Sequence, residues 1–294
     1  MIRQFTLPLI RMIFKPLWIL ISLLLIGMTS ACAFFPESPD ELTLINQNKH
    51  QYQVICPTLS AHFLTEQPTQ LKPPFTLLNW NIYKQQKDSW REQLQKWAES
   101  ADIITLQESK LSPQLIDFSN KNKLFYIQNF AFKYDGDVHG VNTLSRVTAI
   151  SACGTAYKEP WLRIPKTGIA TTYPVQGDKQ SLLVINIHAV NFTFTAAPLQ
   201  EQLSPYLNLI KQHSGPIIFS GDFNTWSDAR LDNVQQSLIK SGFSEALFDE
   251  DKRLTAFGLP LDHIYFRGLK VTDAQSLATE SSDHSPQFVT FELE

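Results

Sequence analysis

Cysteine is scarce in this chain of 294 residues, which contains only Cys32, Cys56 and Cys153. No Cys-x-x-Cys pair and no Cys/His spacing is present, so the sequence excludes the common zinc-binding patterns. Cys32 closes an apolar leader. The other two cysteines have two interpretations, which the sequence leaves open: a disulfide formed in an oxidising compartment, or two unrelated small buried thiols.

An excess of positive charge is also missing. The formal net charge is −3, and the first 31 residues hold three basic and no acidic residues, so the remaining 22 basic and 28 acidic residues leave a balance of −6. Nonspecific binding of nucleic acid depends on many Lys and Arg contacts to phosphate. The chain is therefore not a general polyanion binder. A nuclease would need a local basic patch, for which Arg146, Arg163 and Lys166 are candidates beside the ordinary alternative of solvated surface charge.

The familiar nucleophile and phosphate-binding motifs are absent as well. The chain has no Ser nucleophile elbow, no Gly-rich phosphate loop and no setting typical of a Cys nucleophile. No internal repeat appears. The chemistry must therefore be sought among acids, amides and imidazoles.

Residues 1–35 form a leader with its own character. Three basic residues precede the uncharged run Leu17–Phe35, which is long enough to span a bilayer and has positive charge on one side only. The run contains "MTSAC", which resembles a lipoprotein cleavage box ending at Cys32, with Thr29 where such boxes usually carry Leu. We therefore expect either a lipoprotein signal peptide or an uncleaved membrane anchor. In both cases the protein would be membrane-associated and face the periplasm.

The rest of the chain divides by composition. Residues 36–74 carry six prolines among polar residues and are expected to form a tether and lead-in, so the folded domain would cover 75–294. There, short apolar runs alternate with amphipathic patterns, which predicts a layered α/β domain. The expected strands cover 75–83, 102–109, 181–190, 215–224, 261–266 and 286–293, with helices around 90–98, 112–118, 199–210 and 231–238.

Polar side chains recur at the ends of these predicted strands. A single strand-end Asp is usually a turn residue, but here six segments far apart in sequence each bring an acid, amide or imidazole to a strand end. Open α/β sheets place their ligand sites at the carboxyl ends of strands. The residues concerned are Asn81, Glu108, His188, Asp222 with Asn224, Asp262, and Asp283 with His284.

Strand alternation separates the candidate histidines. In "LLVINIHAV", alternate side chains share one face of the strand. His188 is the last residue on the packing face, so its side chain would reach the mouth of the expected site. In "LDHIYF", Asp262 and His263 point to opposite faces, so we assign Asp262 to function and His263 to packing. The remaining histidines are expected on the surface or in loops, namely His50, His62, His139 and His213.

The strand-end residues suit hydrolysis of a phosphoester. A hard cation such as Mg²⁺ prefers oxygen ligands. The hydrolysis requires that the negative charge on the phosphoryl oxygens be neutralised and that a water molecule be deprotonated. The candidate metal ligands are Glu108, Asn81 and Asp283. The candidates for activating water are Asp222 and His284 supported by Asp262. The candidates for donating to the phosphate are His188, Asn191 and Asn224.

In order along the chain, the motifs resemble those of the endonuclease/exonuclease/phosphatase superfamily. They are "NWNIYK", "LQES", "GVNTLSR", "IHAVN", "GDFN", "LDHIYF" and "SDHSP", and they appear in order from Asn79 to His284. The longer phrases "WNIYKQQ", "NIHAVNF" and "HSGPIIFSGDFN" look closest to the bacterial YafD-like branch. The resemblance implies a DNase I-like four-layered α/β sandwich, in which helices flank two packed mixed sheets.

The resemblance also implies roles for individual residues. Asn81 and Glu108 would be metal ligands assisted by Asp283; Asp222 would orient or activate water, Asn224 would bind phosphate, and Asp262 would hold His284. His188 falls where some members carry His and others Tyr. The sequence offers no acidic partner for His188, which leaves a general-acid role open. His263 replaces the aromatic residue that usually follows the Asp.

The function expected from these motifs is an Mg²⁺-dependent phosphoesterase, with Mn²⁺ as a possible substitute, that acts as a monomer. The substrate stays open between nucleic acid and a phospholipid or inositol-phosphate headgroup, because this fold serves all of these chemistries. The alternative is a membrane-tethered interaction domain without catalysis. Such domains usually lose a metal or His position, and none is lost here.

Overall fold

The computed structural model describes residues 36–39, 43–46, 50–59, 61–63, 69–193 and 195–294. The chain divides into two units, Met1–Glu37 and Ser38–Glu294, and only the last two residues of the first unit are described. The expected signal peptide or anchor lies outside the described residues. In the part of the chain that is described, no helix is both long and apolar enough to cross a membrane.

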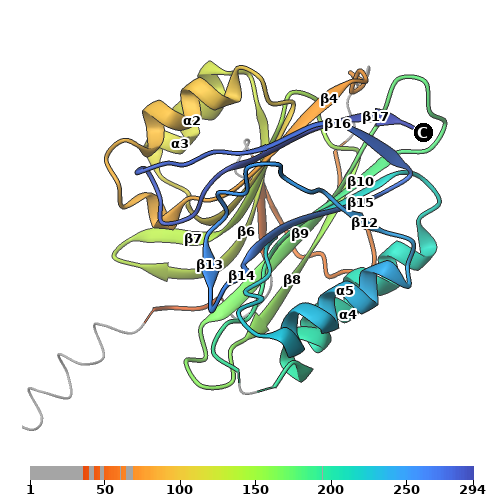
Figure 1. Ribbon diagram of the computed structural model, residues 1–294. Helices are drawn as coiled ribbons and strands as arrows, with labels where there is room; N and C mark the ends of the chain where they lie inside the picture. Colours follow the sequence, from red (N-terminus) through yellow and green to blue (C-terminus); the bar gives the residue numbers. More distant parts are fainter. Residues whose placement is uncertain (1–35, 40–42, 47–49, 60, 64–68, 194) are drawn as a thin grey trace, which may run out of the picture. The chain divides into compact units, whose positions relative to one another are not determined.

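Two large sheets form the centre of the second unit (Figure 1). Among the described residues, the first sheet has the strand order β16 (Leu269–Ser276), β17 (Gln287–Leu293), β4 (Phe75–Asn81), β5 (Ile103–Lys110), β7 (Asp137–Ser145), β6 (Phe125–Tyr134), β1 (Leu44–Asn46), β2 (Gln51–Tyr52). The second has the order β12 (Ser244–Glu245), β15 (Asp262–Arg267), β11 (Ile217–Asp222), β10 (Leu182–His188), β9 (Pro165–Tyr173), β8 (Ser151–Lys158), β3 (Ala61–His62). A separate small hairpin joins β13 (Thr255–Ala256) to β14 (Leu259–Pro260).

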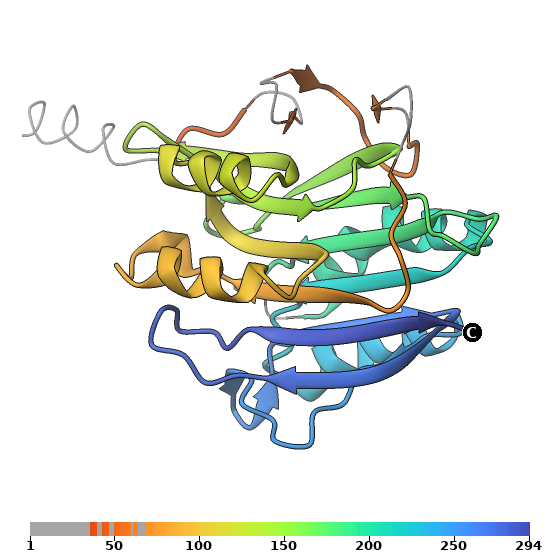
Figure 2. The same ribbon diagram turned by 90° about the horizontal axis from the view of Figure 1, so that it is seen from above.

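Helices cover the outer faces of both sheets. One pair is α2 (Trp90–Ala98) with α3 (Pro113–Lys121), and the other is α4 (Ala197–Gln212) with α5 (Asp228–Ile239). Figure 2 shows the two pairs on opposite sides of the packed sheets. The predicted four-layered α/β sandwich is therefore confirmed.

The helices form where the sequence patterns predict them. In α2, Trp90, Leu94 and Trp97 recur on one buried face, and the ring of Trp97 lies 5.0 Å from that of Trp80 on β4. The helix α3 begins as its cap predicts, because the Ser112 hydroxyl accepts a hydrogen bond from the Leu115 amide at 3.2 Å. Each helix thus buries one apolar stripe against its sheet.

The strand pairing brings the predicted site to one end of the two sheets. The strands β4 and β5 run parallel, as do β10 and β11, so their carboxyl ends point the same way. In the register of these strands, His188 on β10 pairs with Asp222 on β11, and Asp222 pairs with Asp262 on β15, which runs antiparallel to β11. Only glycine fits at position 221 of β11, because a Cβ there would lie 2.0 Å from the carbonyl oxygen of Ile187.

A buried polar layer joins the two sheets below these strand ends. The Gln107 amide nitrogen donates to Asn79 Oδ1 at 2.9 Å and to Asn186 Oδ1 at 2.7 Å, and the hydroxyls of Thr105 and Ser220 lie 3.1 Å apart. All five side chains are buried. Because an unpaired buried polar group is costly, these bonds favour one alignment of the sheets. The layer therefore fixes the strand ends relative to one another.

The segment 36–74 differs from the expected tether. Its strand β1 pairs with β6 and its strand β3 with β8, and Leu44 is fully buried. Cys56 and Cys153 form a disulfide, which decides between the two interpretations of these cysteines. Closing a loop of 97 residues stabilises a fold by roughly 4–5 kcal/mol in the chain-entropy account. The packed unit thus begins near Ser38, because hydrogen bonding and the disulfide draw this segment onto the sheets.

Candidate active site

A pocket of about 400 Å³ opens at the strand ends. Eight of the nine predicted site residues line it: Asn81, Glu108, His188, Asn191, Asp222, Asn224, Asp283 and His284. The ninth, Asp262, lies directly behind His284. The structure therefore brings together residues that are spread over more than 200 positions of the sequence.

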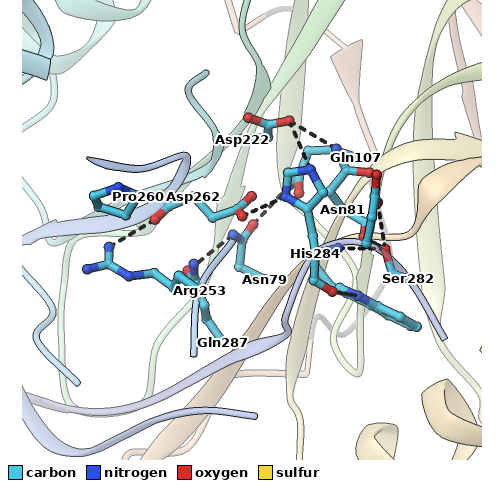
Figure 3. Close-up of polar contacts among 12 residues, drawn as sticks. Asn79, Asn81, Gln107, Asp222, Arg253, Pro260, Asp262, Ser282, His284 and Gln287 are labelled. Carbon is cyan, nitrogen blue, oxygen red and sulfur yellow. Dashed lines mark hydrogen bonds and ion pairs between the residues drawn. The ribbon is translucent and has the colours of Figure 1, made fainter. Parts of the chain in front are cut away.

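His284 lies between two carboxylates (Figure 3). Its Nδ1 is 2.7 Å from Asp262 Oδ2, and its Nε2 is 4.0 Å from Asp222 Oδ2. The loop that carries it is tied down twice: Trp80 Nε1 donates to the His284 carbonyl at 3.0 Å, and the His284 amide donates to the Ser282 hydroxyl at 3.1 Å. The imidazole thus has a fixed orientation.

Charge and burial set the protonation of this group. Burial alone would lower the pKa of His284, but the charges of Asp262, Asp222 and Asp283 and the hydrogen bond that His284 donates to Asp262 raise the pKa to about 10. Burial raises the pKa of Asp222 to about 6, although the His284 charge acts against this rise. Near neutral pH the pair is therefore an imidazolium beside a carboxylate.

Asp222 is held by donors on both of its oxygens. Asn81 Nδ2 donates to Oδ2 at 3.0 Å, and the backbone amide of Asn224 donates to Oδ1 at 3.0 Å. The Asn224 side chain in turn donates to the Ala189 carbonyl at 2.9 Å, which links the ends of β11 and β10. These hydrogen bonds hold the Asp222 carboxylate with one edge toward the pocket.

His263 packs as the strand alternation predicts. It is fully buried, its Nδ1 lies 2.6 Å from Glu245 Oε1, and its Nε2 lies 2.7 Å from the Thr225 hydroxyl. Arg253 donates both to Glu245 and to the backbone carbonyl of Asp262. This buried network therefore supports the strand that carries Asp262 from the side opposite the pocket.

The partner of His188 is a lysine. Its Nε2 lies 2.8 Å from Lys166 Nζ, whereas Asp222 Oδ2 is 3.6 Å away. Burial, followed by the charges of Lys166, Lys84 and His284, holds the pKa of His188 well below its usual range. A neutral imidazole that faces an ammonium is poorly suited to act as a general acid.

Other oxygen donors in the pocket lining suit a hard divalent cation. Glu108 lies at a β-bulge, where the register between β5 and β7 shifts, and the bulge turns its carboxylate into the pocket. Asn81 and the exposed Asp283 line the same pocket, and the oxygen atoms of these three side chains are of the kind that a hard divalent cation prefers. Asp222, Asp262 and His284 also cluster within 4.8 Å of one another and form a second possible cation site, in which the His284 imidazole already bonds to Asp262.

Backbone strain concentrates around the pocket. Among the described residues, nine residues other than glycine have a positive φ, and five of these adjoin the site: Tyr83, Lys84, Gln85, Glu108 and Asn224. Left-handed conformations of such residues cost free energy and persist where the surroundings impose them, as they often do at functional sites. Their clustering supports a functional assignment for this end of the sheets.

Two buried charged residues that sequence reasoning missed position the pocket loops. Glu159 Oε1 accepts from the Asn191 backbone amide at 2.8 Å, and Arg230 Nε donates to the Asn224 carbonyl at 2.7 Å. A second Arg230 nitrogen donates to the Thr193 hydroxyl at 2.6 Å. Nothing in the sequence distinguishes these charges from surface ones, because their burial depends on how α5 and the β8–β9 loop pack.

Two expectations about basic groups need correction. His139 was expected on the surface or in a loop, but it is buried on β7, stacks on Phe132 and lines the pocket. Of the proposed basic patch, only Lys166 lines the pocket. Arg146 instead donates to the Ala98 and Ala101 carbonyls at the end of α2, and Arg163 is exposed outside the pocket lining. The patch therefore does not form. Of the other histidines, His50 and His62 are exposed, and His213 is half-buried.

The outer wall of the pocket is apolar. Phe132, Leu162, Ile164 and Phe192 line it, and Leu162 and Phe192 remain 52% and 59% exposed. Next to them, Trp161 is 67% exposed at the tip of the β8–β9 loop. Exposed apolar side chains gathered at the mouth of a pocket are typical of a binding surface. The sequence pattern did not reveal this surface, because Phe132 lies on the unpredicted strand β6 and the other residues lie in loops.

The two sheets and this site define a DNase I-like phosphoesterase fold. Residues 78–284 match the model of the Endonuclease/Exonuclease/phosphatase family, and the chain belongs to that family. A UPF0294 protein of Vibrio vulnificus is 39% identical over 260 residues, which cover 88% of this chain and 89% of that protein.

Solved structures show the same fold. The catalytic domain of human Nocturnin with a bound sulfate anion is 18% identical with a TM-score of 0.59, covering 78% of this chain and 97% of that one. ANGEL2, a 2′,3′-cyclic phosphatase, is 14% identical with a TM-score of 0.60, covering 78% and 99%. These likenesses concern the fold alone, and the substrate must be argued from the pocket of this chain.

Proposed function

We propose that this protein is a divalent-cation-dependent hydrolase of phosphoester bonds. The observation that carries the proposal is that Asp222, Glu108 and His284, which Asp262 orients, meet at one pocket. It places an oriented imidazolium, a carboxylate and an oxygen-donor set around a space that can hold a phosphate. No other cluster in the described part of the chain combines these groups.

Each residue has a role in this proposal. Glu108, Asn81 and Asp283 would hold Mg²⁺ or Mn²⁺, which when bound neutralises charge on the phosphoryl oxygens. With a pKa of about 6, Asp222 is ionised at neutral pH and can accept a proton from the attacking water. His284 supplies positive charge toward the transition state, and Asp262 holds its orientation. Asn191, Asn224 and His188 complete the phosphate environment.

We further propose that the substrate is a phosphodiester with an apolar group, as a phospholipid headgroup ester has. The apolar wall formed by Leu162, Ile164 and Phe192 adjoins the proposed phosphate position. A nucleic-acid polymer would need a basic track, but Arg146 and Arg163 lie outside the pocket lining and the chain is acidic overall. These observations favour a lipid-like diester over a nucleic acid.

The test of the proposed activity is the cation dependence of a Glu108→Gln variant. We expect full-length protein to hydrolyse bis(p-nitrophenyl) phosphate with Mg²⁺ or Mn²⁺, and the variant to need a higher cation concentration and to reach a lower maximal rate. The reason is that the amide replaces the strongest oxygen donor. The matched control is Glu92→Gln on α2, an exposed residue outside the pocket lining.

Unchanged cation dependence in folded Glu108→Gln protein would move the site elsewhere. Absence of hydrolysis of every phosphoester by the wild-type protein would instead favour the interaction domain without catalysis.

A further inference from the structure

A left-handed turn follows β4 directly. Tyr83, Lys84 and Gln85 have φ values of 48°, 52° and 57°, and none of them is glycine. The turn is held by hydrogen bonds from the Tyr83 amide to Asn81 Oδ1 at 3.1 Å and from the Gln85 side chain to the Lys110 carbonyl at 3.1 Å. Three successive strained residues require such support, so the conformation of this turn is specified by its surroundings.

The turn aims Lys84 at Glu108. The ammonium donates to Glu108 Oε2 and lies 5.4 Å from the centre of the Tyr83 ring. Glu108 also has a positive φ of 50°, so both members of the pair sit on strained backbone. The Lys84 side chain is 36% exposed and the Glu108 side chain 17%, and both line the pocket. The pair is therefore built into the site rather than formed by chance on the surface.

A second lysine faces the pocket from the other sheet. Lys166 on β9 contacts His188, and the charges of Lys84 and Lys166 both act on that histidine. A lysine ammonium is a compact charge on a flexible four-carbon stem, so it can turn from a carboxylate to a nearby anion without backbone movement. Both ammonium groups thus belong to the lining of the pocket proposed for the phosphate.

We propose that Lys84 is an internal cation for Glu108, that it competes there with the divalent ion, and that the displaced ammonium binds the substrate phosphate. The competition follows from charge, because an ammonium and a divalent ion on one carboxylate repel each other. Binding of cation and of phosphate would then be coupled, and the coupling is reciprocal. The competition rests on the cation site of the proposed function, and the phosphate contact rests on its hydrolytic activity.

The test is Lys84→Met in the full chain, with Mn²⁺ and inorganic phosphate as probes in calorimetric titrations. We expect Mn²⁺ to bind about fivefold more tightly, the factor that a partly exposed ion pair is worth. Phosphate in saturating Mn²⁺ should bind about tenfold more weakly, because a charge-assisted bond is lost. The matched control is Lys110→Met, since Lys110 pairs with Asp137 at 3.2 Å next to the site, and neither affinity should change.

Unchanged or weaker Mn²⁺ binding in Lys84→Met would overturn the competition and leave Lys84 a structural residue. A double-mutant cycle guards against indirect effects: in a Glu108→Gln background, Lys84→Met should no longer tighten Mn²⁺ binding. An equal gain in that background would also overturn the inference. If the protein hydrolyses no phosphoester, the proposed function fails while the Mn²⁺ titration still decides the competition.

Discussion

At the scale of single residues, the chemistry of the pocket depends on the protonation states of His284 and His188. His284 is cationic because three carboxylates outweigh the effect of its burial, and His188 is neutral because lysines and burial act together. The sequence contains both histidines in strand-end positions, and nothing in either motif distinguishes their charge. The resemblance implied Asp262 as the partner of His284, whereas only the packing shows that Lys166 lies beside His188.

The His284 proton links stability to pH. The folded-state pKa of about 10 lies above the ordinary value of 6.5, so the stabilisation is fully present below about pH 6.5 and is lost as pH rises toward 10. We expect the Tm of the wild-type protein to fall more steeply between pH 7 and 10 than that of His284→Gln, which carries no titrating group there. Asp222 titrates below this window, with a pKa of about 6. Equal slopes in differential scanning fluorimetry would contradict a charged His284.

At the scale of elements, the sequence predicted those helices and strands in which apolar residues form a recognisable pattern. The strands β4, β5, β10, β11, β15 and β17 and all four helices lie where the apolar runs and caps placed them. The hairpins β6–β7 and β8–β9 were not predicted, because polar residues such as Gln128, Asn129 and Asn142 are buried in them and break the apolar pattern. These hairpins supply Phe132, Leu162 and Ile164 of the apolar wall, so most of the wall was missed with them.

The β8–β9 loop carries a prediction about the substrate. Replacing Trp161 and Leu162 together by Ser should lower turnover of phospholipid vesicles by about tenfold or more, since burying one such side chain is worth about 1.5–3 kcal/mol. Turnover of bis(p-nitrophenyl) phosphate, which is too small to need the loop, should change less than twofold. The matched control is Ile239→Ser at the end of α5, where an exposed apolar residue lies outside the pocket lining.

Vesicle turnover that is unaffected by the Trp161 and Leu162 replacements would contradict the lipid-like substrate. Cleavage of plasmid or of an abasic-site oligonucleotide at a rate that exceeds vesicle turnover would favour the nucleic-acid alternative.

At the scale of the whole molecule, sequence reasoning placed the site better than the domain boundary. Asn81 and His284 are far apart in sequence, yet the family motifs assigned both to one site, and both line one pocket of the structure. The boundary was misplaced because the prolines of 36–74 resemble a linker, whereas Leu44 and Cys56 in the same segment pack on the sheets. Pairing between strands that are far apart in sequence leaves little signal in the local sequence pattern.

The leader makes a prediction about location. Basic residues before the apolar run Leu17–Phe35 favour a membrane-associated protein that faces the periplasm. We expect the protein to fractionate with membranes and to be digested by protease added to spheroplasts. Cys32→Ser should abolish lipid labelling if the leader is a lipoprotein signal, and leave membrane association intact if it is an anchor. Recovery in the soluble cytoplasm would contradict both.

The pairing of His284 with Asp262 is central to the proposed catalysis. The decisive measurement is turnover and Tm on the same preparations of His284→Ala, Asp262→Asn and the double variant. Losing the imidazolium should lower turnover by about 10² or more, and the double variant should be barely worse than the worse single one, because paired groups act as a unit. His50→Ala, at an exposed position, is the control. A lowered Tm with wild-type turnover per folded molecule in His284→Ala would contradict the account.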